Sequence, residues 1–76
     1  MEYVVAHRRD LNGLERYLYR GQEILPGRAE TMFGEAAVIA CERLTEDLVD
    51  RLRSGLFGAR SFESLGEALK YVEELT

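Results

Sequence analysis

A run of six apolar residues, Ala36 to Cys41, lies just upstream of a helix-start signal, and these two features limit the fold more than any others. Thr45, Glu46 and Asp47 read as an N-cap followed by an acidic first turn, which is typical of a helix that begins there. Because the helix starts there and does not continue from upstream, we favour a short buried strand for the apolar run. A helix over residues 35–44 is the alternative, because apolar residues also recur at helical spacing into the next segment.

Other segments carry clearer secondary-structure patterns. Residues 2–8 form a short run rich in β-forming residues, bounded by charged residues, which predicts a strand. Residues 13–20 combine a capping-box spacing with leucines on one stripe, which predicts a short helix. Residues 46–54 and the stretch that follows Ser64 are predicted as helices, and residues 59–62 between them as a strand.

Residues 21–34 form the least regular stretch. Pro26 and Gly27 occupy the two central positions of a type II turn. Apolar residues lie on both sides of the turn, with Ile24 before it and Phe33 after it. The stretch therefore either closes into a small hairpin or lies as a loop over the core, and the sequence leaves both alternatives open.

The order strand-helix-loop-strand-helix-strand-helix predicts an α/β domain, with an α+β arrangement as the alternative. We expect a small open sheet of about three or four strands with about three helices. The last two strands are expected to run parallel under their helices, with one face of the sheet covered. A chain of 76 residues can bury one modest core, so residues 1–76 are predicted to form a single domain.

The composition argues against several classes of protein. The chain contains one cysteine and one histidine, too few for a disulfide framework or for the soft ligands of a structural zinc site. Its longest apolar run is far shorter than the roughly 20 residues of a membrane-spanning helix. We therefore expect no metal, no cofactor, no membrane partner and a cytoplasmic location, which for a phage-encoded chain is the host cytoplasm.

Catalytic motifs are equally scarce in the sequence. The glycines match no phosphate-binding fingerprint. One alternative is a small ligand-binding or catalytic α/β domain, in which His7 and Cys41 would form a base and a thiolate nucleophile if their strands were neighbours. Because no triad, metal set or coupled acid pair accompanies them, we expect a non-enzymatic protein with no catalytic residues.

Three acidic residues, Glu46, Asp47 and Asp50, gather at the start of the middle helix. Arg51 and Arg53 follow at helical pair spacing, so part of this negative charge is expected to be neutralised on the helix surface. As a functional patch, the remaining charge would steer the chain toward another protein with a basic surface.

Nucleic acid is disfavoured as a partner, because the chain carries a net charge of -4. The arginines and tyrosines of residues 8–20 could contact phosphates and bases, but the same residue types also anchor protein interfaces. The sequence therefore predicts a small acidic protein-binding module, of which a phage or mobile-element inhibitor that blocks a basic, nucleic-acid-binding surface is one kind. An oligomeric structural or regulatory subunit, such as a homodimer, is the alternative. The predicted partner-binding residues are Glu46, Asp47, Asp50, Tyr19, Ile24 and Phe33.

Overall fold

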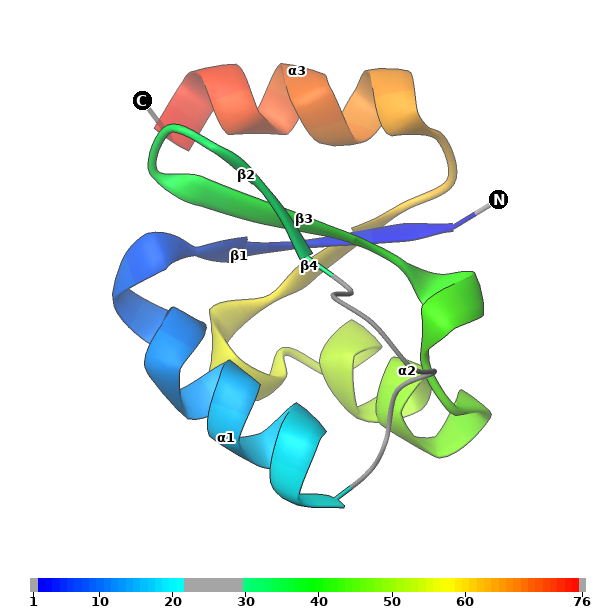
Figure 1. Ribbon diagram of the computed structural model, residues 1–76. Coiled ribbons are helices and arrows are strands. Elements are labelled where there is room, and N and C mark those ends of the chain that lie inside the picture. Colours follow the sequence, from blue (N-terminus) through cyan, green and yellow to red (C-terminus); the bar gives the residue numbers. More distant parts are fainter. Residues whose placement is uncertain (1, 22–29, 76) are drawn as a thin grey trace.

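The computed structural model describes the backbone of residues 2–21 and 30–75, and the side chains of residues 2–16 and 31–75. Four strands and three α-helices make up this part of the chain, and three short 3-10 turns connect some of them (Figure 1). The elements are, in order, β1 (Tyr3–His7), η1 (Arg8–Asp10), α1 (Leu11–Gly21), β2 (Glu30–Phe33), β3 (Ala36–Ala40), η2 (Cys41–Arg43), α2 (Glu46–Arg53), η3 (Leu56–Gly58), β4 (Arg60–Phe62) and α3 (Leu65–Leu75).

The described strands form a four-stranded sheet in the order β2-β3-β1-β4, and every neighbouring pair is antiparallel. Up to β4, this is the β-α-β-β-α-β arrangement of ferredoxin-like folds, to which α3 is added. The predicted small open sheet with three helices is confirmed, and its antiparallel pairing makes the fold α+β, the second of the two predicted classes. Strands β3 and β4 run in the same direction, as expected, but β1 lies between them.

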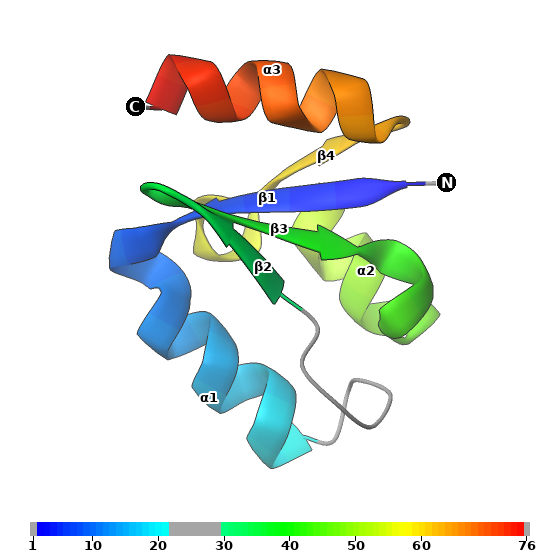
Figure 2. The same ribbon diagram turned by 45° about the horizontal axis from the view of Figure 1, so that its top comes forward.

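Helices cover both faces of the sheet, so the expectation of a single covered face is wrong. Figure 2 shows α3 on one side and both α1 and α2 on the other. Side chains alternate between the two faces along each strand, so the sheet contributes to a hydrophobic core on each face. Val4 and Ile39 face α1 and α2, whereas Val5 and Val38 face α3. The prediction failed because it assigned no element to the second face, whereas α3 turns back after β4 and packs its buried residues, Ala68 and Val72, there.

Residues 36–40 form a strand, which confirms the favoured interpretation of the ambiguous segment 35–44. Strand β3 lies inside the sheet and is buried on both faces, and such a strand has a continuous apolar sequence instead of an alternating one. The helix-start signal is confirmed as well, because Oγ1 of Thr45 accepts a hydrogen bond from the backbone N–H of Leu48 at 3.3 Å.

Strands β2 and β3 form a hairpin through Gly34 and Glu35. Gly34 has a positive φ of 62° at the first central position of this two-residue connection, where mirror-image turns favour glycine. Residues 30–33 thus pair with β3, in a different hairpin from the one considered within residues 21–34. The predicted type II turn at Pro26 and Gly27 lies outside the described residues.

The η3 turn places an aromatic ring against helix α1. Phe57 has a positive φ of 56°, between Gly55 and Gly58, which also have positive φ values. Its ring lies so close to Gly13 that a Cβ atom there would be 3.0 Å from Cε1 of Phe57. The absence of a side chain at residue 13 therefore lets α1 approach η3.

Replacing Gly13 with alanine is expected to destabilise the protein by about 1 kcal/mol, because overpacking against Phe57 outweighs the helix propensity that alanine adds. In a Phe57→Ala background, the same substitution should stabilise the protein by about 0.5–1 kcal/mol. Urea unfolding of the four proteins of this double-mutant cycle measures both free energies. If Gly13→Ala changes the free energy of unfolding with the same sign in both backgrounds, the Phe57 ring is not what disfavours a side chain at residue 13.

Candidate functional site

Helix α2 presents its acidic residues on the solvent side. Leu48, Val49 and Leu52 are buried against the sheet, so the residues between them point outward. Glu46, Asp47 and Asp50 are all exposed, as the sequence predicts for a charged helix face.

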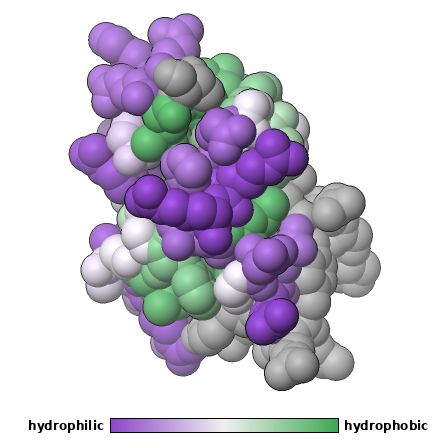
Figure 3. Space-filling model, turned by 90° about the vertical axis from the view of Figure 1, so that its left-hand side faces the viewer, coloured by the Kyte–Doolittle hydropathy of each residue, from purple (hydrophilic) through white to green (hydrophobic). Residues whose placement is uncertain are grey.

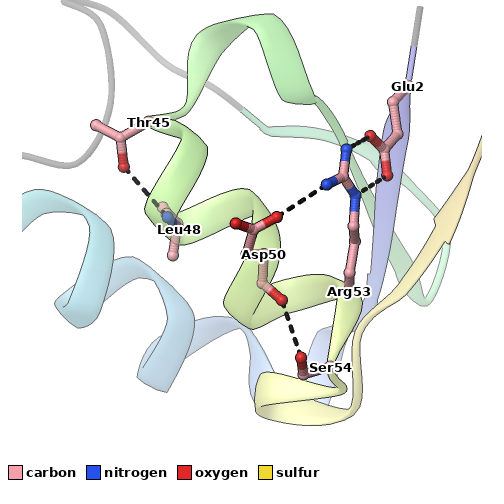
Figure 4. A network of polar contacts seen from close by, with 6 residues as sticks. All are labelled: Glu2, Thr45, Leu48, Asp50, Arg53 and Ser54. Carbon is pink, nitrogen blue, oxygen red and sulfur yellow. Dashed lines mark hydrogen bonds and ion pairs between the residues drawn. The ribbon is translucent and has the colours of Figure 1, made fainter.

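Arg53 joins the end of α2 to the start of the first strand (Figure 4). Its guanidinium group binds both carboxylate oxygens of Glu2, with 2.8 Å between Nε and Oε2, and its Nη1 lies 2.9 Å from Oδ1 of Asp50. The hydrogen bond from Arg53 lowers the pKa of the Glu2 carboxyl group below its ordinary value. Arg53 thus links Glu2 and Asp50, which are distant in sequence.

Asp47 lies apart from this network. Its carboxylate pairs with Arg51 one turn along the helix, and it lines a second hollow together with Asp50, Ser54 and Leu56. The predicted partial neutralisation of the helix face is confirmed, because Arg51 pairs with Asp47 and Arg53 with Asp50. Asp47 and Asp50 therefore share one hollow near the end of α2.

A shallow depression of about 430 Å³, here called the acidic hollow, opens beside Glu46 and Asp50. Within the described ranges, Glu42 and Glu46 form no ion pair with another residue. The acidic hollow is lined by the carboxylates of Glu2, Glu42, Glu46 and Asp50, by Arg53, and by the less polar side chains of Cys41, Leu44 and Val49.

Glu2 and Arg53 were absent from the site residues predicted from sequence. Glu2 reaches the hollow because the backbone N–H of Cys41 donates to its carbonyl at 2.9 Å, at the end of the β1–β3 ladder. Local patterns contain no signal for such a contact, since it depends on strand pairing between distant segments. Glu42 belongs to the same run of acids in the sequence, but its position over the hollow depends on η2.

His7 and Cys41 lie at opposite ends of β1, so the proposed nucleophile and base are not brought together. Cys41 adjoins Glu2, and about five residues of strand at ~3.3 Å each separate it from His7, or roughly 16 Å. Nδ1 of His7 instead accepts a hydrogen bond from the N–H of Arg9 at 3.1 Å and caps η1. Burial, with a smaller contribution from the charge of Glu2, raises the pKa of the Cys41 thiol to about 11.

Phe33 lies at the other end of the sheet from the acidic hollow. It is 38% exposed and adjoins the hairpin turn, which lies beside Arg8 because the N–H of Arg8 donates to the carbonyl of Glu35 at 2.7 Å. Figure 3 views this end of the molecule, where hydrophilic side chains form a band between apolar areas. The structure therefore does not unite Phe33 with the acids of α2. The side chain of Tyr19 and all of Ile24 lie outside the described part of the chain.

The fold and the hollow define a small α+β domain with an acidic, open surface. Comparisons with protein-family models, with curated proteins and with solved structures found no match. None of the helices within residues 2–21 and 30–75 is long and apolar enough to cross a membrane. Over the same ranges, no three His, Cys, Asp or Glu side chains are grouped as metal ligands.

Proposed function

We propose that this protein is a non-enzymatic binding module that docks its acidic hollow onto a basic surface of a partner protein. One observation carries the proposal: acidic residues from three separate segments, the residue before β1, η2 and α2, line one depression together with less polar residues. The module would act by binding alone.

The chemistry of the hollow suits an arginine or lysine side chain. Leu44 and Val49 offer contact for the aliphatic stem of such a side chain, while the surrounding carboxylates attract its charged head. Glu42 and Glu46 contribute long-range attraction, which speeds association more than it strengthens the final complex. Arg53 fixes Glu2 and Asp50 in place, so binding need not order those two side chains.

Basic surfaces of this kind are common on proteins that bind nucleic acids. A chain that covers such a surface would compete with DNA or RNA, and an inhibitor encoded by a phage or mobile element would act in this way. The partner would therefore be released by added salt and displaced by its own nucleic acid.

The acidic hollow is tested with a tripeptide that has blocked ends and a central arginine, titrated against the protein at low salt. We expect amide chemical-shift changes to centre on Glu42, Leu44 and Glu46. The double variant Glu42→Gln and Glu46→Gln should weaken binding by roughly three- to tenfold, since exposed charge pairs contribute modestly.

Two comparisons make this titration decisive. The double variant Glu35→Gln and Glu73→Gln removes the same charge from other exposed places and should leave binding unchanged. A peptide with norleucine in place of arginine should not bind. Shifts that spread over the whole surface, or that survive the Glu42 and Glu46 substitutions, would contradict the proposal.

A further inference from the structure

The backbone hydrogen bonds of β1 alternate between its two neighbouring strands. Two backbone hydrogen bonds lie at the ends of the β1–β3 ladder: the N–H of Arg8 donates to the carbonyl of Glu35, and the N–H of Cys41 donates to the carbonyl of Glu2. Both continue the residue pairing of β1 with β3. In an antiparallel ladder, every second residue bonds to the same neighbour. The even-numbered residues of β1 therefore bond to β3, and residues 3 and 5 bond to β4.

This alternation shows where the backbone of β4 points. Phe62 and Arg60 pair with residues 3 and 5, so their N–H and C=O groups are directed at β1. Ser61, between them, directs its N–H and C=O away from β1, toward the open side of the sheet. Strand β4 forms that edge, and no residue of the described ranges pairs with its outer side.

Helix α3 places an alternating row of charges along the same edge. Glu67, Lys70 and Glu74 follow each other at helical spacing and line one hollow with Arg60 and Tyr71 of the sheet edge and helix. Neither Lys70 nor Arg60 forms an ion pair with another described residue. The row Glu-Lys-Glu is complementary to an antiparallel copy when the two-fold axis passes between Lys70 and Glu74, because each Lys70 then lies beside the glutamate of the other copy.

Aromatic contacts prepare Arg60 for such an interface. Its guanidinium carbon lies 4.8 Å from the ring centre of Tyr71 and 5.9 Å from that of Phe62, so the side chain is held over the rings. The two rings themselves pack 5.2 Å apart. Stacked arginine and aromatic side chains are the residue types that dominate protein interfaces.

We propose that β4 and the Glu67-Lys70-Glu74 row of α3 form a dimer interface with a second copy of this chain. A two-fold axis through Ser61 would pair the edges antiparallel, with two backbone hydrogen bonds between Ser61 and the partner's Ser61. Arg60 would then lie opposite the partner's Phe62, on the face that carries α3. The same surface on both copies is what a two-fold interface requires. This surface borders the acidic hollow, because Glu2 and Arg53 also line a depression with Ser61 and Phe62.

Sedimentation equilibrium from about 10 µM to about 1 mM tests the proposal, because a dimer gains population with concentration. We expect a reversible monomer–dimer equilibrium. The variant Ser61→Pro removes an N–H that faces solvent in the monomer, so the fold should persist, as circular dichroism can verify. Its dimer dissociation constant should rise by roughly tenfold or more, since two N–H donors are lost.

A second variant tests the helix side of the interface without touching the backbone. Lys70→Glu makes the row entirely acidic and should weaken the dimer by roughly tenfold. Arg16→Glu, on the exposed side of α1, makes the same change of charge and should leave the equilibrium unaltered. A monomer at the highest concentration, or a dimer that resists both Ser61→Pro and Lys70→Glu, would overturn this interface while leaving the proposal for the acidic hollow untouched.

Discussion

Replacing Leu48 with alanine is expected to remove about 2–5 kcal/mol from the free energy of unfolding. Leu48 is fully buried in the core between α2 and the sheet, so truncation leaves a cavity as well as lost apolar contact. A chain of this length has a total stability of roughly 4–11 kcal/mol, so much of the margin disappears. Urea unfolding followed by circular dichroism measures the change.

The matched control is Leu65→Ala at the start of α3. Leu65 is 42% exposed, and its truncation should cost under about 1 kcal/mol. Equal losses at the two leucines would contradict the placement of α2 over the sheet. Because α2 carries Glu46 and Asp50, the Leu48 variant should also lose the arginine-peptide shifts when it unfolds.

The thiol of Cys41 is expected to react far more slowly in the folded protein than in the unfolded chain. Its pKa of about 11, against an ordinary thiol value of 9.0, lowers the thiolate fraction near pH 8 by roughly a hundredfold. The rate of reaction with a disulfide reagent should rise about tenfold per pH unit between about pH 8 and pH 10. Stopped-flow absorbance, with urea-unfolded protein as the reference, measures both rates.

The same shift in pKa makes a prediction for stability. A thiol that holds its proton to higher pH when folded stabilises the fold fully below the unfolded pKa near 9, and this contribution is lost as pH rises toward about 11. Glu2→Gln should lower the pKa of Cys41 and speed its reaction, because Glu2 raises that pKa and Arg53 lowers it. A rate independent of pH, or equal in folded and unfolded protein, would show that Cys41 is not a buried thiol.

Local signals located most of the secondary structure. The N-cap at Thr45 and the capping box at Ser64, whose Oγ accepts from the N–H of Glu67 at 3.2 Å, both start helices where the sequence predicts them. These signals succeed because a cap involves residues within one turn. The strand at residues 36–40 was the harder inference, decided by the helix that follows it.

Tertiary placement was less accessible to the sequence. The order of strands, the cover that α3 gives the second face, and the approach of Glu2 to Arg53 all depend on contacts between distant segments. The surroundings of the acidic residues depend on such contacts as well. Asp47 and Asp50 are both exposed and line one hollow, as helical spacing predicts, whereas the neighbouring η2 and Glu2 decide that Asp50 also borders the acidic hollow.

The central position of β1 also determines when the domain can assemble during synthesis. Strand β1 leaves the ribosome first, yet its two neighbours in the sheet are β3 and β4, which are made after α1 and after α2. The pairing of Val4 with Ser61 joins segments from almost opposite ends of the described chain. Pairing between distant segments slows folding, because a long loop must close before the contact forms. The edge of β1 that pairs with β4 therefore has no native partner strand in the nascent chain until residues 60–62 emerge.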